Sequence, residues 1–337
     1  MKVDETTVVL GIETSCDETA AAVVIGGGDV LSSVVASQLE VHARFGGVVP
    51  EIASRAHVEA LTPVIARAID ESGVPIQRID AIAATVGPGL IGALLVGVSA
   101  AKAMALVLDR PFVAVNHLEA HLYAALLDDP QVEFPMLVVL VSGGNTLFVE
   151  MRGHGNYRII GQTIDDAAGE AFDKVARFLG LGYPGGPAIE SAAVDGSATA
   201  IDFPRAMLHD GLNVSFSGLK TAVINHVRKN PSVSTADVAA SFQIACVDVL
   251  TVKARRAAKQ IGARTIALGG GVAANSLLRS EMMSMCQTDR LHLVLPSMSM
   301  CTDNAAMIAS AGWYRLRSDG PSHLGAGANP NLQLTSL

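Results

Sequence analysis

The sequence predicts an α/β protein made of two similar halves. Half of its 337 residues are hydrophobic and only 17% are charged, which indicates a large buried core. Short apolar runs alternate with long helical patterns, as in α/β folds. The same order of strand, glycine turn and helix occurs twice along the chain. Because one core rarely serves so long a chain, we expect two domains.

The first half, expected over residues 1–130, opens with two short strands joined by a polar turn. Its elements are a strand at 8–10, a turn at 11–15, a strand at 19–25, a helix at 50–71, a strand at 81–86, a glycine turn at 87–89 with a helix after it, and a strand at 112–115 before a last helix. Glu13 and Asp17 lie in or beside the first turn, where we expect them to face a ligand cleft.

The second half, expected over residues 131–337, repeats that order. Its elements are a strand at 137–141, a turn at 142–146, a strand at 147–150, a helix at 236–261, a strand at 265–268, a turn at 269–271 with a helix after it, and a strand at 291–295 before Asp303. Residues 151–235 have no counterpart in the first half and are expected to be an insertion. Two such halves facing each other predict ligand sites at the strand ends, in a central cleft.

Charge and cysteine usage narrow the class of protein. The formal net charge of −8 argues against a surface coated for nucleic acid, so an RNA partner would need a local patch or other subunits. Four cysteines without a CxxC pair, and an acidic N-terminus without a signal peptide, predict a cytoplasmic protein. The apolar stretch 81–101 is interrupted by Gly-Pro-Gly, which favours a buried strand and helix over a membrane span.

His117 and His121 are four residues apart, so on a helix they share one face and can bind one metal ion. The pair alone is equally compatible with a structural role. The duplication places Asp303 at the equivalent helix of the second half, aimed at the same cleft. Two imidazoles and one carboxylate form an open, catalytic type of ligand set, suited to Fe(II) or Zn(II). A zinc protease is an alternative, but Glu119 lies about 200° around the helix from His117 and not beside it, as HExxH would require.

Glycine-rich turns in the second half suggest a nucleotide. Ser142-Gly143-Gly144 and residues 269–271 offer backbone N–H groups to a phosphate, and Asn275 follows the second turn. Structural turns are the alternative for each one taken singly. Asp173 lies on a helical face where an acid can accept ribose hydroxyls. The sequence has no P-loop motif.

These stretches together resemble the tRNA N6-adenosine threonylcarbamoyltransferase family, known as TsaD or, earlier, Gcp and sialoglycoprotease. The resemblance spans almost the whole chain and rests on GIETSCDET at 11–19, GGVVPEIASRAH at 46–57, GPGLIGALLVG at 87–97, NHLEAH at 116–121, LVSGGNT at 140–146, DDAAGEAFDK at 165–174, YPGGP at 183–187, SFSGLKT at 215–221, GGGVAAN at 269–275 and CTDNAAMIA at 301–309.

The resemblance implies duplicated actin/sugar-kinase/Hsp70-type domains. It also implies transfer of a threonylcarbamoyl group from threonylcarbamoyl-AMP to the 6-amino group of the adenosine 3′ of the anticodon, in tRNAs that read ANN codons. The implied cofactors are one divalent metal ion and an adenylate ligand, with ATP, ADP or AMP as related ligands. The implied partners are tRNA, a paralogue of the TsaB type, a small ATPase of the TsaE type and an upstream threonylcarbamoyl-AMP synthase.

The resemblance also assigns residues. It implies metal binding by His117, His121 and Asp303. It implies contacts to the adenylate from Leu140, Val141, Ser142, Gly143, Gly144, Asp173, Gly186 and Asn275. No general base is evident, so Glu13 and Asp17 are our candidates, and Lys220 is a candidate for neutralising phosphate.

The sequence departs from the pattern of many bacterial family members at two positions, and two further alternative functions have to be considered. Asn116 and Asn145 replace the histidines of many bacterial members, so auxiliary contacts to the metal or donor are expected to differ. A non-catalytic scaffold of the same fold would lack the three metal ligands, which are all present. A sugar kinase or ATPase of this fold is expected to have an aspartate in place of Glu13.

Overall fold

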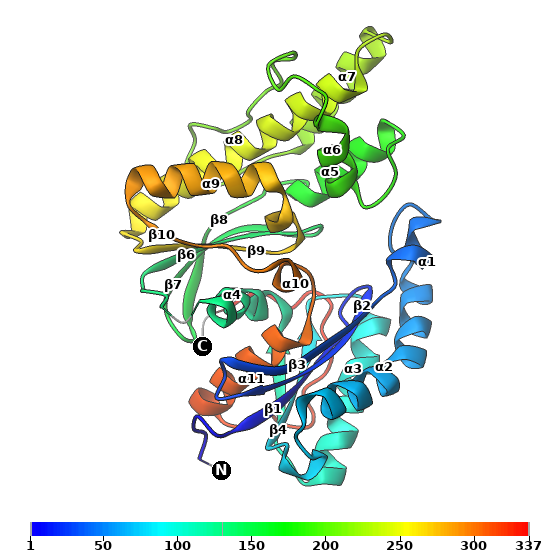
Figure 1. The fold of residues 1–337 in the computed structure, drawn as a ribbon, viewed down its shortest axis with the longest axis vertical. Coiled ribbons are helices and arrows are strands. Elements are labelled where there is room, and N and C mark those ends of the chain that lie inside the picture. Colours follow the sequence, from blue (N-terminus) through cyan, green and yellow to red (C-terminus); the bar gives the residue numbers. More distant parts are fainter. Residues whose placement is uncertain (1, 130, 336–337) are drawn as a thin grey trace. The chain divides into compact units, whose positions relative to one another are not determined.

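The computed structural model describes residues 2–129 and 131–335 (Figure 1). Contacts divide the chain into two units, Met1–Pro130 with Thr302–Leu337, and Gln131–Cys301. Our expected halves assigned everything after residue 130 to the second half. The C-terminal segment that carries Asp303 instead belongs to the first unit.

The first unit is a five-stranded mixed sheet with helices on both faces. Its strands are β1 (Val8–Glu13), β2 (Glu18–Ile25), β3 (Asp29–Ser37), β4 (Ala81–Gly87) and β5 (Phe112–Asn116). Its helices are α1 (Leu39–Ala43), α2 (Pro50–Ser72), η1 (Ile76–Arg78), α3 (Ile91–Leu108), α4 (His117–Asp128) and α11 (Ala305–Asp319). Side chains of α2 and α3 form one core with alternate residues of β1, β2 and β4.

The second unit has the same sheet. Its strands are β6 (Met136–Val141), β7 (Thr146–Gly153), β8 (Asn156–Gln162), β9 (Thr265–Gly269) and β10 (His292–Val294). Its helices are α5 (Ala168–Phe178), α6 (Gly185–Ala193), α7 (Ser217–Lys229), α8 (Thr235–Ile261), η2 (Gly271–Ala274), α9 (Ser276–Asp289) and α10 (Met298–Cys301). The fully buried helix α8 residues Phe242, Cys246 and Leu250 lie at the centre of its core.

Strand order confirms the predicted duplication. The first sheet runs β3-β2-β1-β4-β5, and the second, read from its other edge, runs β8-β7-β6-β9-β10. Each begins with an antiparallel meander of three strands, and the central strand then pairs in parallel with a strand that follows much later. β3 and β8 are therefore counterparts. The predicted insertion at residues 151–235 was wrong at its start, because it included the end of β7 and the whole of β8, which have counterparts in the first unit.

Helix α11 is held against the first sheet by small residues. A Cβ added at Gly11 of β1 would lie 2.3 Å from the Ala305 carbonyl oxygen and 2.7 Å from the Ala309 nitrogen. A Cβ added at Gly312 would lie 2.5 Å from the Ala83 Cβ. Glycine at these positions therefore allows the helix backbone to lie directly on the strands. This packing returns the chain to the first unit after the second is complete.

The end of β1 differs from expectation. Residues 11–13 were expected in a turn, but they continue β1, because Gly11, Ile12 and Glu13 each pair with a β2 residue. The turn is shorter, at residues 14–17. Strand alternation then puts Glu13 on the same face as Gly11, the face that α11 covers.

Within residues 2–129 and 131–335, two helices, α3 and α8, are long and apolar enough to cross a membrane by length and composition. Ala93, Leu94 and Val98 of α3 are buried in the first unit, and most of α8 is buried in the second. These helices therefore supply core residues, as we expected for the apolar stretch that ends in α3.

Candidate functional site

Helix α4 presents the histidine pair. Asn116 caps this helix, because its side-chain oxygen accepts hydrogen bonds from the Leu118 and Glu119 N–H groups. His117 is therefore the first helical residue, and His121 follows one turn later. Their rings lie edge to face with centroids 4.7 Å apart. The asparagine that departs from many bacterial sequences thus fixes where the helix begins.

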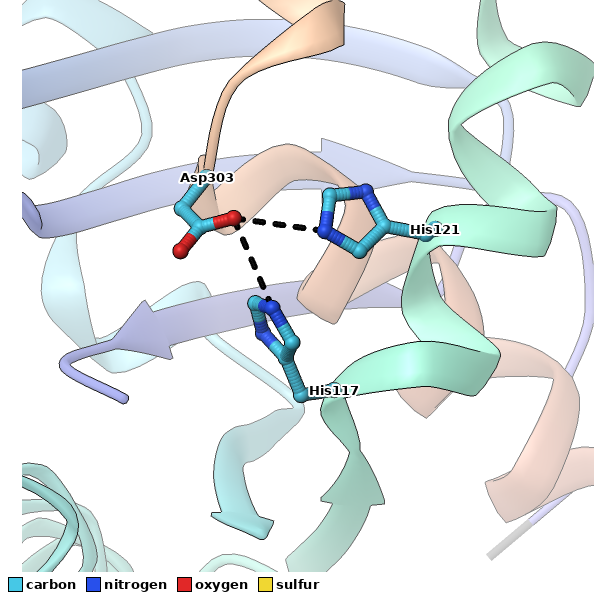
Figure 2. Close-up of side chains that lie close together, drawn as sticks. All are labelled: His117, His121 and Asp303. Atoms are coloured by element: carbon cyan, nitrogen blue, oxygen red, sulfur yellow. Dashed lines mark ion pairs between the residues drawn. The ribbon is translucent and has the colours of Figure 1, made fainter. Parts of the chain in front are cut away.

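Asp303 joins the two histidines. It immediately precedes Asn304, which caps α11 by accepting a hydrogen bond from the Met307 N–H group. One Asp303 oxygen lies 3.4 Å from His117 Nε2 and 3.2 Å from His121 Nε2 (Figure 2). One donor atom from each residue lies within 4.8 Å of the others. The three predicted ligands therefore come together within the first unit, and the expectation that they come from two halves was wrong.

The donor chemistry fits a metal ion. Both ring nitrogens of His121 are buried, and neither makes a hydrogen bond to a residue that the structure describes. The Nε2 atom is at ion-pair distance, 3.2 Å, from an Asp303 oxygen. Burying unsatisfied nitrogens is costly, so a ligand at Nε2 would account for this arrangement.

Charge in the cluster is balanced between acid and imidazole. Burial opposes ionisation of Asp303, but His117 and His121 hold its pKa at about 2, so this group is a carboxylate. Burial likewise opposes protonation of His117, yet Asp303 and Glu13 raise its pKa to about 9. Two carboxylates therefore draw a positive charge to this ring, the position that a divalent cation would fill.

Glu13 is not placed to act as a general base. Its side chain is fully buried, and it accepts hydrogen bonds from Thr85 Oγ1 at 2.5 Å and from the Ser15 N–H group. It also lies 3.1 Å from His117 Nδ1. A carboxylate so enclosed cannot reach the amino group of a bulky substrate, and our assignment of Glu13 is corrected. It instead orients the His117 ring, as carboxylates behind metal-binding histidines do.

Asp17 remains a candidate base. It is partly exposed in the turn between β1 and β2, and its backbone oxygen accepts a hydrogen bond from the Gln38 N–H group at 3.0 Å. Burial raises the pKa of both Cys16 and Glu18, and the charges of Asp17 and Asp303 raise both further, with Asp303 the stronger of the two at Glu18. The turn is therefore an acidic border of the candidate metal site.

Glu119 points away from the histidines, as predicted. It is fully buried and pairs with Arg315 of α11. Asn116, and not Glu119, caps the start of helix α4. Neighbouring rings also join these two helices, since Tyr123 and Tyr314 stack with centroids 4.9 Å apart. The helix that carries the two histidines and the helix that follows Asp303 are thus fastened to each other.

The glycines in and beside the candidate nucleotide-binding turns of the second unit fall into two groups, according to the space available for a Cβ atom. A Cβ added at Gly169, Gly185 or Gly270 would meet backbone atoms at 2.4 to 2.5 Å, so packing explains these three. A Cβ added at Gly143, Gly144, Gly186 or Gly271 would meet nothing within 4 Å. Packing does not explain this second group, whereas a ligand that approaches the backbone closely would.

Leu140 and Val141 end the buried strand β6 and lead into the first of these turns. The turn is closed by a hydrogen bond from the Ser142 N–H group to the Asn145 oxygen at 2.8 Å, and Asn145 N–H in turn donates to Ser142 Oγ at 3.1 Å. Gly270 lies directly against the Val141 oxygen. The ends of β6 and β9, which pair in parallel, thus bring both glycine turns to one sheet edge.

Asp173 and Asn275 have structural partners. Asp173 accepts a hydrogen bond from the Gly185 N–H group at 2.7 Å, and burial raises its pKa. Asn275 caps α9 and donates to Gln243 Oε1 at 3.1 Å and Glu190 Oε2 at 3.4 Å. Sequence reasoning missed Glu190, which also accepts from the Ser276 N–H group at 2.9 Å. Only its position four residues after Gly186, on the same helix, could have suggested it.

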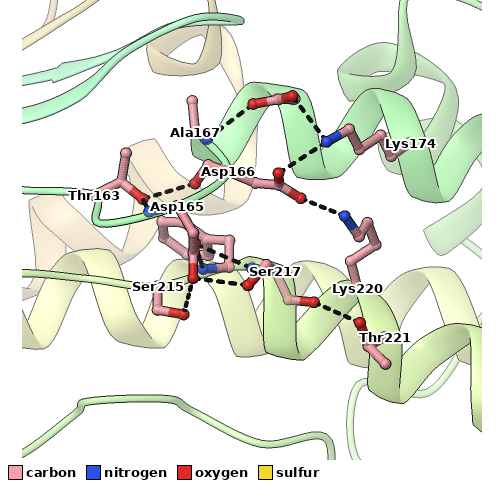
Figure 3. A network of polar contacts seen from close by, with 11 residues as sticks. Thr163, Asp165, Asp166, Ala167, Lys174, Ser215, Ser217, Lys220 and Thr221 are labelled. Carbon is pink, nitrogen blue, oxygen red and sulfur yellow. Dashed lines mark hydrogen bonds and ion pairs between the residues drawn. The ribbon is translucent and has the colours of Figure 1, made fainter.

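The SFSGLKT motif fastens α7 to the start of α5. Asp165 accepts hydrogen bonds from the backbone and hydroxyl groups of Ser217 and from Ser215 (Figure 3). Lys220 donates to Asp166 at 2.6 Å, and Lys174 donates to the other oxygen of that carboxylate at 2.8 Å. The charge of Lys220 is therefore already balanced within the protein, which argues against our suggestion that it neutralises phosphate.

Comparison with known sequences decides the family. A model of tRNA N6-adenosine threonylcarbamoyltransferase matches residues 29–310. This chain belongs to that family. The transferase of Symbiobacterium thermophilum is 52% identical over 329 residues, which cover 97% of this chain and 96% of the relative. The transferase of Clostridium perfringens strain SM101 is 50% identical over 332 residues, which cover 97% and 98%.

Solved structures show the fold. HypF of T. kodakarensis superimposes with a TM-score of 0.64 and 16% identity, covering 93% of this chain and 48% of that one. Component A of (R)-2-hydroxyglutaryl-CoA dehydratase from Acidaminococcus fermentans gives a TM-score of 0.55 and 11% identity, covering 92% and 99%. The duplicated sheets therefore belong to the actin/sugar-kinase/Hsp70-type fold.

Membership of the threonylcarbamoyltransferase family gives the activity. The protein is a transferase that forms threonylcarbamoyladenosine in tRNA. The family identity also supports an enzyme that depends on a metal and uses a nucleotide.

Proposed function

We propose that His117, His121 and Asp303 bind one divalent metal ion, Fe(II) or Zn(II), that orients the threonylcarbamoyl donor. The observation that carries this proposal is the buried His121 ring, whose nitrogens make no hydrogen bond to any described residue while its Nε2 lies 3.2 Å from Asp303. A bound ion supplies Lewis acidity toward phosphate or carbamoyl oxygens, an effect worth several kcal/mol.

Glu13 would hold His117 in the state that such an ion requires. If Nδ1–H donates to Glu13, the lone pair of Nε2 remains on the side of Asp303. Thr85 and the Ser15 backbone fix the carboxylate in turn. The residues behind the ligands thus set the tautomer and the direction of the ring.

The second group of glycines would admit the adenylate part of the donor. Threonylcarbamoyl-AMP joins a carbamate to a phosphate, so the leaving group on transfer is AMP. The uncovered backbone at Gly143, Gly144 and Gly186 suits the negative charge of this phosphate. Asp173 and Asn275 would hold these turns in place through their hydrogen bonds and would line the site.

The nucleophile is the 6-amino group of the adenosine 3′ of the anticodon, in tRNAs that read ANN codons. We propose Asp17 as the group that accepts its proton, because Glu13 is enclosed. The Asp17→Ala variant should lower single-turnover transfer from threonylcarbamoyl-AMP to unmodified tRNA while retaining adenylate binding. Unchanged transfer would exclude this role.

Metal binding has a direct test. Titration with Zn(II) in competition with a coloured chelator should give one site in the wild-type chain and none in His117→Ala or Asp303→Asn. His209 is exposed and lies in the other unit, so His209→Ala is a matched control that should bind normally. Equal affinity in all four proteins would exclude the site.

Nucleotide binding is tested by the contrast between the two groups of glycines. Gly186→Ala has room for its Cβ, so it should fold normally and lose AMP affinity by about tenfold or more. Gly185→Ala, one residue away, has no room beside Asp173 and should instead lower thermal stability. Normal AMP binding by Gly186→Ala would contradict the assignment.

A metalloprotease is the weaker alternative. It would need a general base beside the metal, whereas Glu119 is buried on the other side of α4 and is paired with Arg315. The site has no acid in the position that HExxH enzymes use.

The proposed setting is the cytoplasm, where tRNA and the synthase that makes threonylcarbamoyl-AMP occur. We also propose a paralogous partner of the TsaB type and a small ATPase of the TsaE type. The net charge of −8 favours such help in holding tRNA. Transfer measured with and without these proteins, in wild type and His117→Ala, would establish what the chain does alone.

A further inference from the structure

Two buried histidines lie outside the candidate metal cluster, and the proposed reaction uses neither of them. His57 of α2 and His42 of α1 have no exposed surface, and Gln38 between them is 6% exposed. All lie in the first unit. Buried polar side chains require partners, and the hydrogen bonds of these three form a continuous chain.

The first step of the chain fixes the tautomer of His57. Its Nε2 lies 3.0 Å from the Cys16 carbonyl oxygen, which can only accept, so Nε2 carries a hydrogen. Its Nδ1 then accepts from Thr19 Oγ1 at 2.8 Å and, at the longer distance of 3.3 Å, from the Gln38 amide. Burial also lowers the pKa of His57, which agrees with a neutral ring.

The second step fixes Gln38 and His42. The Gln38 amide nitrogen faces two acceptors, His57 Nδ1 and the Ala53 carbonyl oxygen at 3.5 Å, so the opposite orientation would bring oxygen against oxygen. The Gln38 oxygen therefore accepts from His42 Nε2 at 3.1 Å. His42 Nδ1 accepts from the Val49 N–H group at 3.3 Å. The four hydrogen bonds of the chain therefore run in one direction. Each group donates to the next, from the Val49 N–H group to the Cys16 carbonyl oxygen.

The chain joins an outer segment to the border of the metal cluster. Its far end is the segment 38–49, where His42 is the buried residue of α1 and Phe45 is 59% exposed. Its near end is the turn that holds Cys16, and the neighbouring Ser15 hydroxyl lies 3.2 Å from His117 Nδ1. The Gln38 N–H group also donates to the Asp17 oxygen.

We infer that Gln38, His42 and His57 are positioning residues that hold the turn at 14–17 beside His117 and make its position depend on the outer segment 38–49. The directed hydrogen bonds carry this inference. A simple packing role would not require each ring to be a specific tautomer, nor a polar chain to end on the carbonyl group of that turn. Only the second readout below rests on the proposed metal site.

Hydrogen exchange of the full-length protein tests the coupling. In His42→Leu, exchange should rise about tenfold at the Val49 amide and also at the distant Ser15 and Gln38 amides. In His57→Leu the same three amides should respond. In His57→Gln, whose amide can still donate to the Cys16 oxygen, Ser15 should return toward wild type. Val58→Ala, at an exposed neighbour on the same helix, is the control.

The double variant His42→Leu/His57→Leu should exchange no faster at Ser15 than either single variant, because each already breaks the chain. Additive effects, or changes confined to amides beside each substitution, would overturn the inference. Zn(II) affinity is the second readout and should fall about tenfold in His42→Leu. Absence of Zn(II) binding in wild type would refute the metal site and leave the exchange test valid, whereas normal affinity in a His42→Leu protein with faster Ser15 exchange would refute the link to His117.

Discussion

Substituting Gly11 with alanine should damage the proposed metal site without changing any of its three proposed ligands. The added Cβ would lie 2.3 Å from the Ala305 carbonyl oxygen. Carbon and oxygen normally approach to about 3.3 Å, so α11 must retreat by about 1 Å. Overpacking of this kind costs about 1–3 kcal/mol, and Tm should fall by about 3–8 °C. Asp303, just before this helix, would move with it away from His117 and His121.

Metal sites tolerate errors of only about 0.2 Å in ligand distance, so Zn(II) affinity should fall about 10- to 100-fold. Gly28→Ala is the matched control, since its Cβ would meet nothing within 4 Å. Both substitutions reduce the conformational entropy of the unfolded chain by a similar amount. The difference in stability between the two variants therefore reports on the contact with α11. Calorimetry and competitive Zn(II) titration measure both quantities. If Gly11→Ala matched Gly28→Ala in both, the close packing of α11 would not set the ligand geometry.

Three further perturbations have defined outcomes. Arg315→Met leaves the buried Glu119 carboxylate without this partner and should lower the free energy of unfolding, measured with denaturant, by about 3 kcal/mol. An unchanged free energy of unfolding would show that the pair is dispensable. Because burial lowers the pKa of His57, the unfolded chain binds a proton at this ring at a higher pH than the folded chain does, so stability should fall as the pH falls from about 7.5 to about 5.5. His57→Leu should lose that part of the dependence, and an identical pH profile would contradict it. Lys253→Met removes the buried ammonium that binds the carbonyl groups of residues 210–211, and limited proteolysis should then cleave this segment faster than in wild type.

The duplicated sheets were predictable because their central strands are apolar and three of these strands, β4, β6 and β9, end at glycine-bearing turns. β3 escaped prediction because it is an edge strand with only Ser32 and Val34 buried, so its sequence lacks a strong alternating pattern. The continuation of β1 through Glu13 was likewise hidden. A glycine and an acid are typical of turns, and only pairing with β2 keeps them extended.

The sequence proposed His117, His121 and Asp303 as metal ligands, and the structure brings these three residues together, but the sequence did not predict the route by which they meet. A strict duplication assigns the last helix to the second half. The position of α11 depends instead on Gly11 and Gly312, which allow close approach only where they face Ala305 and Ala83. Such pairwise complementarity between distant segments has no local pattern. The same limit applies to Glu13, whose role follows from its three hydrogen-bond partners and not from its neighbours in sequence.

The return of α11 to the first sheet also sets an order of events during synthesis. His117 and His121 leave the ribosome before any of the second unit, while Asp303 follows all of it. At about 5–20 residues per second, the histidines wait roughly ten to forty seconds for the carboxylate. During that interval the nascent first sheet lacks the helix that covers Gly11. The first unit is therefore finished last, and no fragment that stops before Asp303 can assemble all three ligands.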